Sequence, residues 1–148
     1  AAKGINKSRL VLEGQSPHMD LLARHNDVDI ALDTFPYSGG LTTYEALWMG
    51  VPVITVPGET FASRHSKSHL ETIGLPELIA ENKDDYVRLA VELACDAGRM
   101  ADLRTGLRSQ MMNSPICDGE KFSSDFTALM RKIWVDWCLT QDAGNLKQ

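Results

Sequence analysis

Four short apolar runs divide the first half of the chain. They are rich in Leu, Val and Ile, and each has the length of a buried strand. The runs are 9–13 (RLVLE), 27–33 (DVDIALD), 51–58 (VPVITVPG) and 76–80 (PELIA). Helical patterns lie between them: one starts at Ser16-Pro17, one covers 42–49, and one covers 62–73 with Gly74 as its C-cap. This alternation predicts an α/β fold with parallel βαβ units and helices on both faces of the sheet.

Only helical patterns follow Asp84. They cover 84–95, about 97–112 and about 121–139. The last segment has one apolar stripe at spacings of three and four residues, which predicts that Trp137 belongs to a core. The stripe contains Phe122, Phe126, Leu129, Ile133 and Trp137. We therefore expect one domain over 1–148, with βα units over about 1–83 and a helical part over about 84–140.

Composition changes this picture little, because 43% apolar and 24% charged residues are typical of soluble globular proteins. A net charge of −5 gives no overall reason to bind nucleic acid or an anionic membrane, so we expect neither partner. No run approaches the roughly 20 apolar residues of a membrane span, and no signal-peptide pattern opens the chain, which favours a cytoplasmic protein. Cys95, Cys117 and Cys138 are far apart and lack a CxxC pair, which predicts free thiols.

Candidate chemistry lies in the loops after the predicted strands, because open parallel sheets bind ligands beyond the carboxyl ends of their strands. These loops are EGQSPHMD (13–20), DTFPYSGGLTT (33–43) and PGETFASR (57–64). The pair Gly39-Gly40 precedes a helix, whose N-terminus offers unpaired N–H groups and about half a positive charge to an anion. A diphosphate would fit there, although most such glycine pairs only make a tight turn.

Glu45 has two interpretations. As the third residue after Thr42, it can complete a capping box and stabilise the helix start by about 1 kcal/mol. Projecting into the crevice instead, it would accept hydrogen bonds from ribose hydroxyls. The pattern alone leaves both open.

The histidines give weaker signals. His65 and His69 lie four residues apart on a predicted helix, but no third ligand and no HExxH glutamate accompanies them, so we expect no metal. His18 starts a helix just beyond a strand and is either a base or phosphate contact or an exposed surface residue. No Ser-His-Asp set, P-loop or carboxylate pair stands out, and we identify no catalytic residue.

A long segment of the chain also resembles a known protein family. Residues 28–80, from VDIALDTFPYSGGLTTYEALWMG to LETIGLPELIA, closely resemble the catalytic C-terminal region of O-linked N-acetylglucosamine transferases. The resemblance extends upstream to RLVLEGQSPHMDLL and downstream through LRSQMMNSPICDGEKFSSDF, and covers nearly the whole chain. Bacterial relatives of the tetratricopeptide-repeat and SPINDLY-like kind look most similar.

The resemblance implies a GT-B glycosyltransferase with two Rossmann-like halves, of which this is the C-terminal, donor-binding one. Such enzymes are inverting, need no metal, and transfer a sugar, here N-acetylglucosamine from its UDP donor, to Ser or Thr of proteins. By position, the loop at Ser16 and His18 would contact the uracil, and Gly40, Leu41 and Thr42 would meet the diphosphate. Glu45 stands where the family has an acidic residue for ribose. Arg24 falls at a position that is basic in the animal enzymes.

Two features depart from the family pattern. Gly40-Leu41-Thr42 stands where animal enzymes have His-Thr-Thr, and His18 stands where they have Lys, so the nucleotide and the sugar stay open. The other catalytic half, which organises the acceptor, is absent from this sequence, and we expect no transfer by the chain alone. In the usual strand order 3-2-1-4-5-6, residues 9–13 would be the third strand, with the first two missing. We expect either that another copy fills the gap through exposed strand edges, giving a homo-oligomer, or that the first strand is displaced.

Two alternatives remain at this stage. One is a non-catalytic interaction domain with the same fold, and the other is a different GT-B enzyme with another nucleotide-sugar donor. Nucleotide binding separates the first alternative from an enzyme, and the choice between UDP and GDP separates the second.

Overall fold

A small parallel sheet lies at the centre of the protein. The computed structural model describes residues 4–145, with side chains as far as residue 140, so the ends of the predicted 1–148 domain lie outside it. Strand β1 (Ala31–Leu32) pairs with β2 (Val53–Ile54), Ala31 opposite Val53 and Leu32 opposite Ile54. One further parallel bridge joins Thr55 to Ile79. The predicted α/β class with parallel strands is confirmed.

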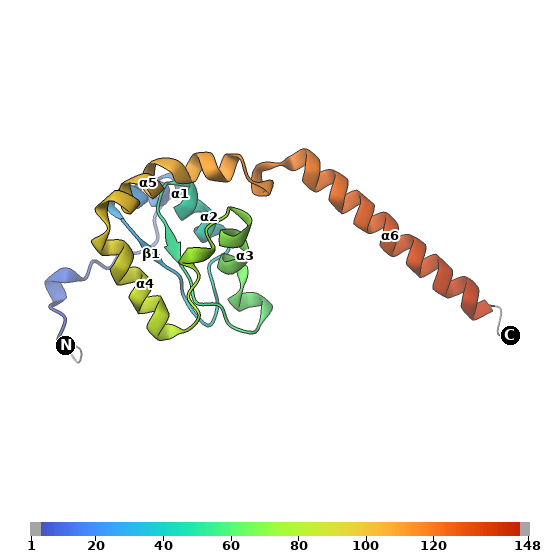
Figure 1. The fold of residues 1–148 in the computed structure, drawn as a ribbon, viewed down its shortest axis with the longest axis horizontal. Helices are drawn as coiled ribbons and strands as arrows, with labels where there is room; N and C mark the ends of the chain where they lie inside the picture. Colours follow the sequence, from blue (N-terminus) through green and yellow to red (C-terminus); the bar gives the residue numbers. More distant parts are fainter. Residues whose placement is uncertain (1–3, 146–148) are drawn as a thin grey trace.

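Six α-helices complete the described chain. They are α1 (His18–Arg24), α2 (Leu41–Trp48), α3 (His65–Thr72), α4 (Lys83–Cys95), α5 (Ala97–Met112) and α6 (Gly119–Asn145). Short 3-10 turns lie at Lys7–Arg9, His25–Asp27, Phe61–Ser63, Pro76–Leu78 and Pro115–Cys117. Figure 1 shows α1 to α5 gathered around the strands and α6 extending away from them. Gly74 follows the end of α3 with a positive φ, as its predicted C-cap role requires.

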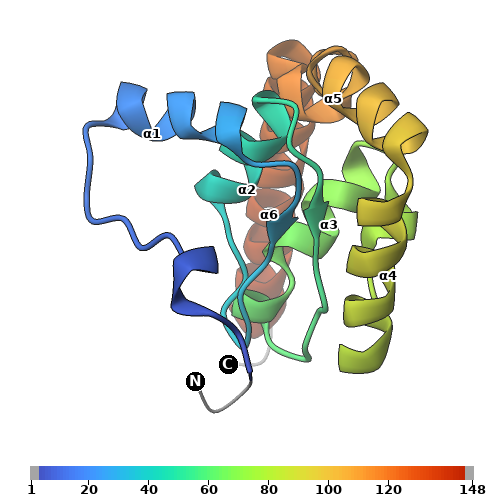
Figure 2. The same ribbon diagram turned by 90° about the vertical axis from the view of Figure 1, so that its left-hand side faces the viewer.

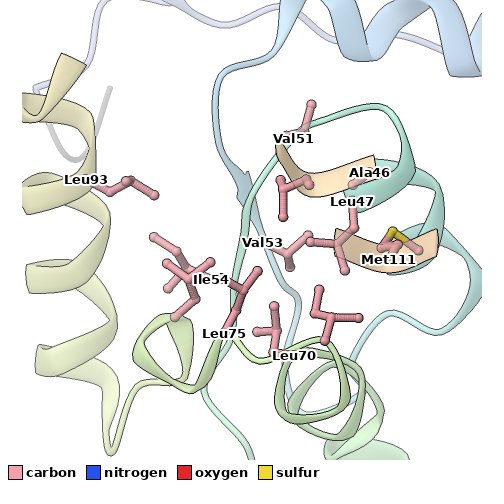
Figure 3. Close-up of a cluster of buried hydrophobic side chains, with 12 residues drawn as sticks. Ala46, Leu47, Val51, Val53, Ile54, Leu70, Leu75, Leu93 and Met111 are labelled. Carbon is pink, nitrogen blue, oxygen red and sulfur yellow. The ribbon is translucent and has the colours of Figure 1, made fainter. Parts of the chain in front are cut away.

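The core forms where α2, α3, α4 and α5 meet the strands. Leu47 of α2, Ile54 of β2 and Leu70 of α3 are fully buried. Leu93 of α4 and Leu107 of α5 also belong to the cluster. Figure 3 shows side chains of this cluster pointing toward one another. Each such side chain contributes about 1.5–3 kcal/mol of hydrophobic stabilisation. The short strands are held by this packing because two-residue ladders supply few hydrogen bonds.

Polar side chains of α5 hold the carboxyl ends of the preceding helices. Arg104 donates to the carbonyl oxygens of His25 and Val28 at 2.9 and 2.7 Å, beyond the end of α1. Arg108 Nε donates to the Trp48 carbonyl at the end of α2 at 2.8 Å, and Gln110 donates to Ile73 after α3 at 2.7 Å. Cationic and amide donors satisfy carbonyls that a helix end leaves free. The N-termini of α2 and α3 therefore lie away from α5, beyond the carboxyl ends of the strands.

Residues 9–13 are not a strand, and this prediction is wrong. Leu10, Val11 and Leu12 are 57%, 81% and 93% exposed. Figure 2 shows the N-terminal segment running outside the body of the domain. In the described sheet β1 pairs with β2 alone, so its other edge is open, but residues 9–13 do not pair with it. In the single chain residues 9–13 lie outside the sheet, and assembly with another copy stays a prediction.

The predicted strand 76–80 is only partly correct. Pro76–Leu78 forms a 3-10 turn, and Ile79 alone pairs with Thr55. Pro76 lacks the N–H that a ladder needs, which favours a turn at this point. The prediction for 62–73 merges the turn Phe61–Ser63 with α3.

The apolar stripe of α6 is exposed, so the prediction that it forms core is wrong for the described structure. Phe122 is 67% exposed and Trp137 is 52% exposed. Some apolar rings stack on a neighbour within the helix, as do Trp134 and Trp137 with centroids 5.3 Å apart. Periodicity identifies an apolar face without identifying what covers it.

Over residues 4–145, no helix is long and apolar enough to cross a membrane.

Gly50 gives a test of how tightly α2 and α5 pack. Its φ is +80°, and an added Cβ would lie 2.6 Å from the backbone oxygen of Arg104. We expect Gly50→Ala to lower the free energy of unfolding by about 1–3 kcal/mol, measured by chemical denaturation. Gly106→Ala is the matched control, because nothing lies within 4 Å of its added Cβ inside α5. Stability should rise there by up to about 1 kcal/mol, and equal effects at both sites would contradict the packing described.

Candidate functional site

Asp33 organises the loop at the carboxyl end of β1. Its side chain accepts a hydrogen bond from the Thr55 hydroxyl at 2.6 Å and another from the Gly39 N–H at 2.7 Å. The residue is only 8% exposed, and the Tyr86 hydroxyl donates to its carbonyl oxygen at 2.9 Å. A buried carboxylate is tolerated only with such partners. Asp33 therefore ties the loop that begins α2 to the end of the neighbouring strand.

Ser38 closes the N-terminus of α3 from the same loop. Its hydroxyl oxygen accepts from the N–H groups of His65 and Ser66 at 3.0 and 3.4 Å. The Ser66 hydroxyl, fully buried, donates to the Gly39 carbonyl at 3.1 Å and lies 2.8 Å from the Thr43 hydroxyl. These bonds satisfy first-turn donors of α3 and join it to α2.

The N-terminus of α2, by contrast, is open. Its N-cap is Gly40, and no described side chain caps the helix. The two glycines have different roles: a Cβ on Gly39 would lie 2.5 Å from the Thr43 hydroxyl, whereas on Gly40 the nearest atom is 3.9 Å away. The lack of a side chain at Gly39 therefore lets the loop approach Thr43 closely. The lack of one at Gly40 leaves the N-terminus of α2 accessible. Uncapped first-turn N–H groups with the helix dipole favour an anion at this point.

Glu45 does not form a capping box, so that interpretation is wrong. The helix begins at Leu41, which places Thr42 second and Glu45 fifth, beyond the register that a box requires. Glu45 instead contacts His18, with 2.7 Å between Oε1 and Nε2. The Glu45 side chain is 11% exposed and that of His18 is 63% exposed. The structure thus brings together two predicted site residues from α1 and α2 that lie 27 positions apart.

The remaining predicted residues lie in neighbouring pockets. Ser16 and Arg24 line a pocket of about 580 Å³ between the 13–16 loop and α1. Arg24 is held there by Glu13 at 3.1 Å and by Asp27 at 3.6 Å. Thr42 lines a separate pocket of about 230 Å³ at the end of β1, together with Asp33 and Gly39. Arg24 is therefore paired with carboxylates beside α1, while the first turn of α2 and the His18–Glu45 pair form the centre of the candidate site.

Two histidines of α3 lie near α2, His69 against Tyr44 and His65 beside Gly40. The His69 ring stacks on Tyr44 with centroids 3.8 Å apart, and its Nδ1 is buried without a hydrogen-bond partner among the described residues. Burial lowers the pKa of His69, the charge of His65 lowers it further, and Asp33 acts in the opposite direction.

Between residues 4 and 140, no group of three or more His, Cys, Asp or Glu residues could hold a metal ion. The three cysteines are free.

The polar network that builds the site was not predicted from the sequence. Its members are Asp33, Ser38, Thr43, Thr55 and Ser66. A signal existed for Asp33, because an acidic residue ends an apolar strand directly before a glycine pair. The small hydroxyl residues gave no signal, because Ser and Thr at loop and helix starts are common.

A match to a known protein family covers most of the chain. Residues 1–126 match the family described as Glycosyl transferase family 41. The chain belongs to glycosyl transferase family 41.

Relatives of this family 41 chain come from plants and animals. The probable UDP-N-acetylglucosamine–peptide N-acetylglucosaminyltransferase SPINDLY of Eustoma exaltatum subsp. russellianum is 48% identical over 119 residues, which are 80% of this chain and 13% of that protein. The UDP-N-acetylglucosamine–peptide N-acetylglucosaminyltransferase of Caenorhabditis elegans is 32% identical over 132 residues, covering 89% of this chain and 12% of that protein. The chain thus spans about an eighth of the length of these relatives.

A solved structure of the same family shows the same arrangement. A mutant of Thermobaculum terrenum O-GlcNAc transferase is 41% identical and superimposes with a TM-score of 0.87. The match covers 94% of this chain and 27% of that one. The resemblance to O-linked N-acetylglucosamine transferases and the partial GT-B, Rossmann-like fold are therefore confirmed.

Removal of the Asp33 carboxylate tests the network in this family 41 fold. Asp33→Ala leaves two donors without their acceptor, and we expect the free energy of unfolding to fall by about 2–4 kcal/mol in chemical denaturation. Asp29→Ala removes an exposed carboxylate four positions earlier and should change it by less than about 0.5 kcal/mol. A loss at Asp33 no larger than at Asp29 would contradict the role assigned to Asp33.

Proposed function

We propose that this chain forms the donor-nucleotide wall of a protein O-glycosyltransferase and binds a UDP-sugar. The observation that carries the proposal is the uncapped N-terminus of α2 beside the His18–Glu45 pair, at the carboxyl end of β1. The relatives named above are UDP-N-acetylglucosamine–peptide N-acetylglucosaminyltransferases, which supports N-acetylglucosamine as the sugar and a protein as the acceptor.

The diphosphate would bind at Gly40, Leu41 and Thr42. Leu41 is 70% exposed and its side chain has no polar atom, so its backbone N–H is the group that can bind an anion. Ser38 already occupies the neighbouring N-terminus of α3, which leaves α2 as the free one of the two. Backbone donors at a helix start suit the two negative charges of a diphosphate.

The nucleoside would lie along α1 and the second turn of α2. Glu45 uses Oε1 for His18, and its second oxygen can accept from ribose hydroxyls. His18 is largely exposed and can contact the base, and Ser16 and Arg24 line the adjoining pocket at the base end. The protein would transfer the sugar to Ser or Thr with inversion. No residue of this chain has a catalytic role in the proposal, and a cytoplasmic location stays a prediction.

Nucleotide titration tests this assignment. We expect calorimetry to show UDP binding and weaker GDP binding, and Glu45→Ala to weaken UDP about tenfold through loss of charged hydrogen bonds to ribose. The same substitution should barely change the affinity of 2′,3′-dideoxy-UDP, which lacks those hydroxyls. Glu120→Ala removes an exposed carboxylate from α6, away from the candidate loops, and serves as the control. A chain that binds neither nucleotide contradicts the proposal, and tighter binding of GDP indicates another donor.

The diphosphate partners in this proposal are N–H groups, and no metal takes part. We therefore expect the affinity for UDP to be the same with excess EDTA and with millimolar Mg²⁺, measured in matched buffers by calorimetry. An affinity that falls at least tenfold on chelation would show that a cation bridges the phosphates.

A further inference from the structure

His65 places an imidazole at the open end of α2. An added Cβ on Gly40 would lie 3.9 Å from His65 Nδ1, the nearest described atom beyond Gly40 and its two chain neighbours. Gly40 has no side chain of its own, so the space beside the first turn of α2 is lined by a ring from α3. Sequence analysis considered His65 only as a metal ligand, and no metal cluster includes it in the described part of the chain.

Two aromatic side chains contact the His65 ring. Phe61 lies edge-on to it with centroids 4.6 Å apart, and Tyr37 lies edge-on at 6.0 Å. The backbone N–H of His65 is anchored by Ser38 at 3.0 Å. A group fixed by packing and by its backbone loses little freedom when it binds a ligand.

Neither ring nitrogen of His65 has a hydrogen-bond partner among the described residues, whereas the neighbouring cations Arg64 and Lys67 both have partners. Lys67 pairs with Glu71 at 3.5 Å, and Arg64 donates to the Gly58 carbonyl at 3.1 Å. The imidazole is thus the available side-chain donor of α3 beside Gly40.

We propose that His65 is a phosphate-binding residue of this site, donating a hydrogen bond to the diphosphate that the first turn of α2 receives. The assignment rests on the proposed function. The histidine adds a side-chain donor where Gly40 and Leu41 supply only backbone groups, and it makes α3 part of the donor site. Imidazole donors to phosphate form charge-assisted bonds, which are stronger than neutral ones.

His65→Phe separates phosphate binding from packing, because it keeps an aromatic ring between Phe61 and Tyr37 and removes both nitrogens. We expect UDP to bind about tenfold more weakly in calorimetry, equal to about 1.4 kcal/mol. Binding of uridine, followed by ligand-detected NMR, should not change. His65→Gln retains a side-chain N–H donor and should recover part of the affinity for UDP.

Lys67→Ala is the matched control. It removes a full positive charge from the same helix, and its amine is directed to Glu71, so UDP affinity should change less than twofold. Unchanged UDP affinity in His65→Phe, or equal losses for UDP and uridine, would overturn the assignment of His65 and leave the proposed function intact. A wild-type chain that binds no UDP would overturn both.

Discussion

The carboxylate of Asp33 is the constraint on which the site depends. It is buried at the end of β1 and accepts hydrogen bonds from Gly39 and from Thr55 on the neighbouring strand. This double contact determines where the 33–39 loop turns and therefore where α2 begins. From that loop, Ser38 reaches α3 and satisfies its first N–H groups. One acidic side chain thus positions the starts of both α2 and α3. The N-terminus of α3 is capped by Ser38, whereas no described side chain caps α2.

The sequence predicted the architecture well where the pattern was long. Helix α5 begins and ends as expected, and α4 differs by one residue at its start. Periods of 3.6 residues over three or four turns are hard to mistake. The parallel pairing of 27–33 with 51–58 also follows from two apolar runs flanking a helix, although only Ala31–Leu32 and Val53–Ile54 form regular ladder.

The sequence could not predict features that depend on distant partners. Residues 9–13 have strand composition but pair with no described strand, and the apolar stripe of α6 is exposed. The candidate site shows the same limit. His18 and Glu45 were each predicted as site residues, but their contact depends on how α1 packs beside α2. Ser66 and Thr43 meet across two helices, and nothing local in either segment indicates that pair.

Helix α2 is only eight residues, or about 12 Å, and serves two purposes at once. Thr43, Ala46 and Leu47 face the interior. Leu41 is exposed, and Glu45 contacts His18 at the candidate site. Occupancy of the outer face and folding of the inner face are consequently linked equilibria, so a ligand held by α2 raises the melting temperature in proportion to the logarithm of its concentration. The same linkage means that substitutions deep in the core can alter ligand affinity without contacting the ligand. In such a short helix, fold stability and recognition cannot evolve independently.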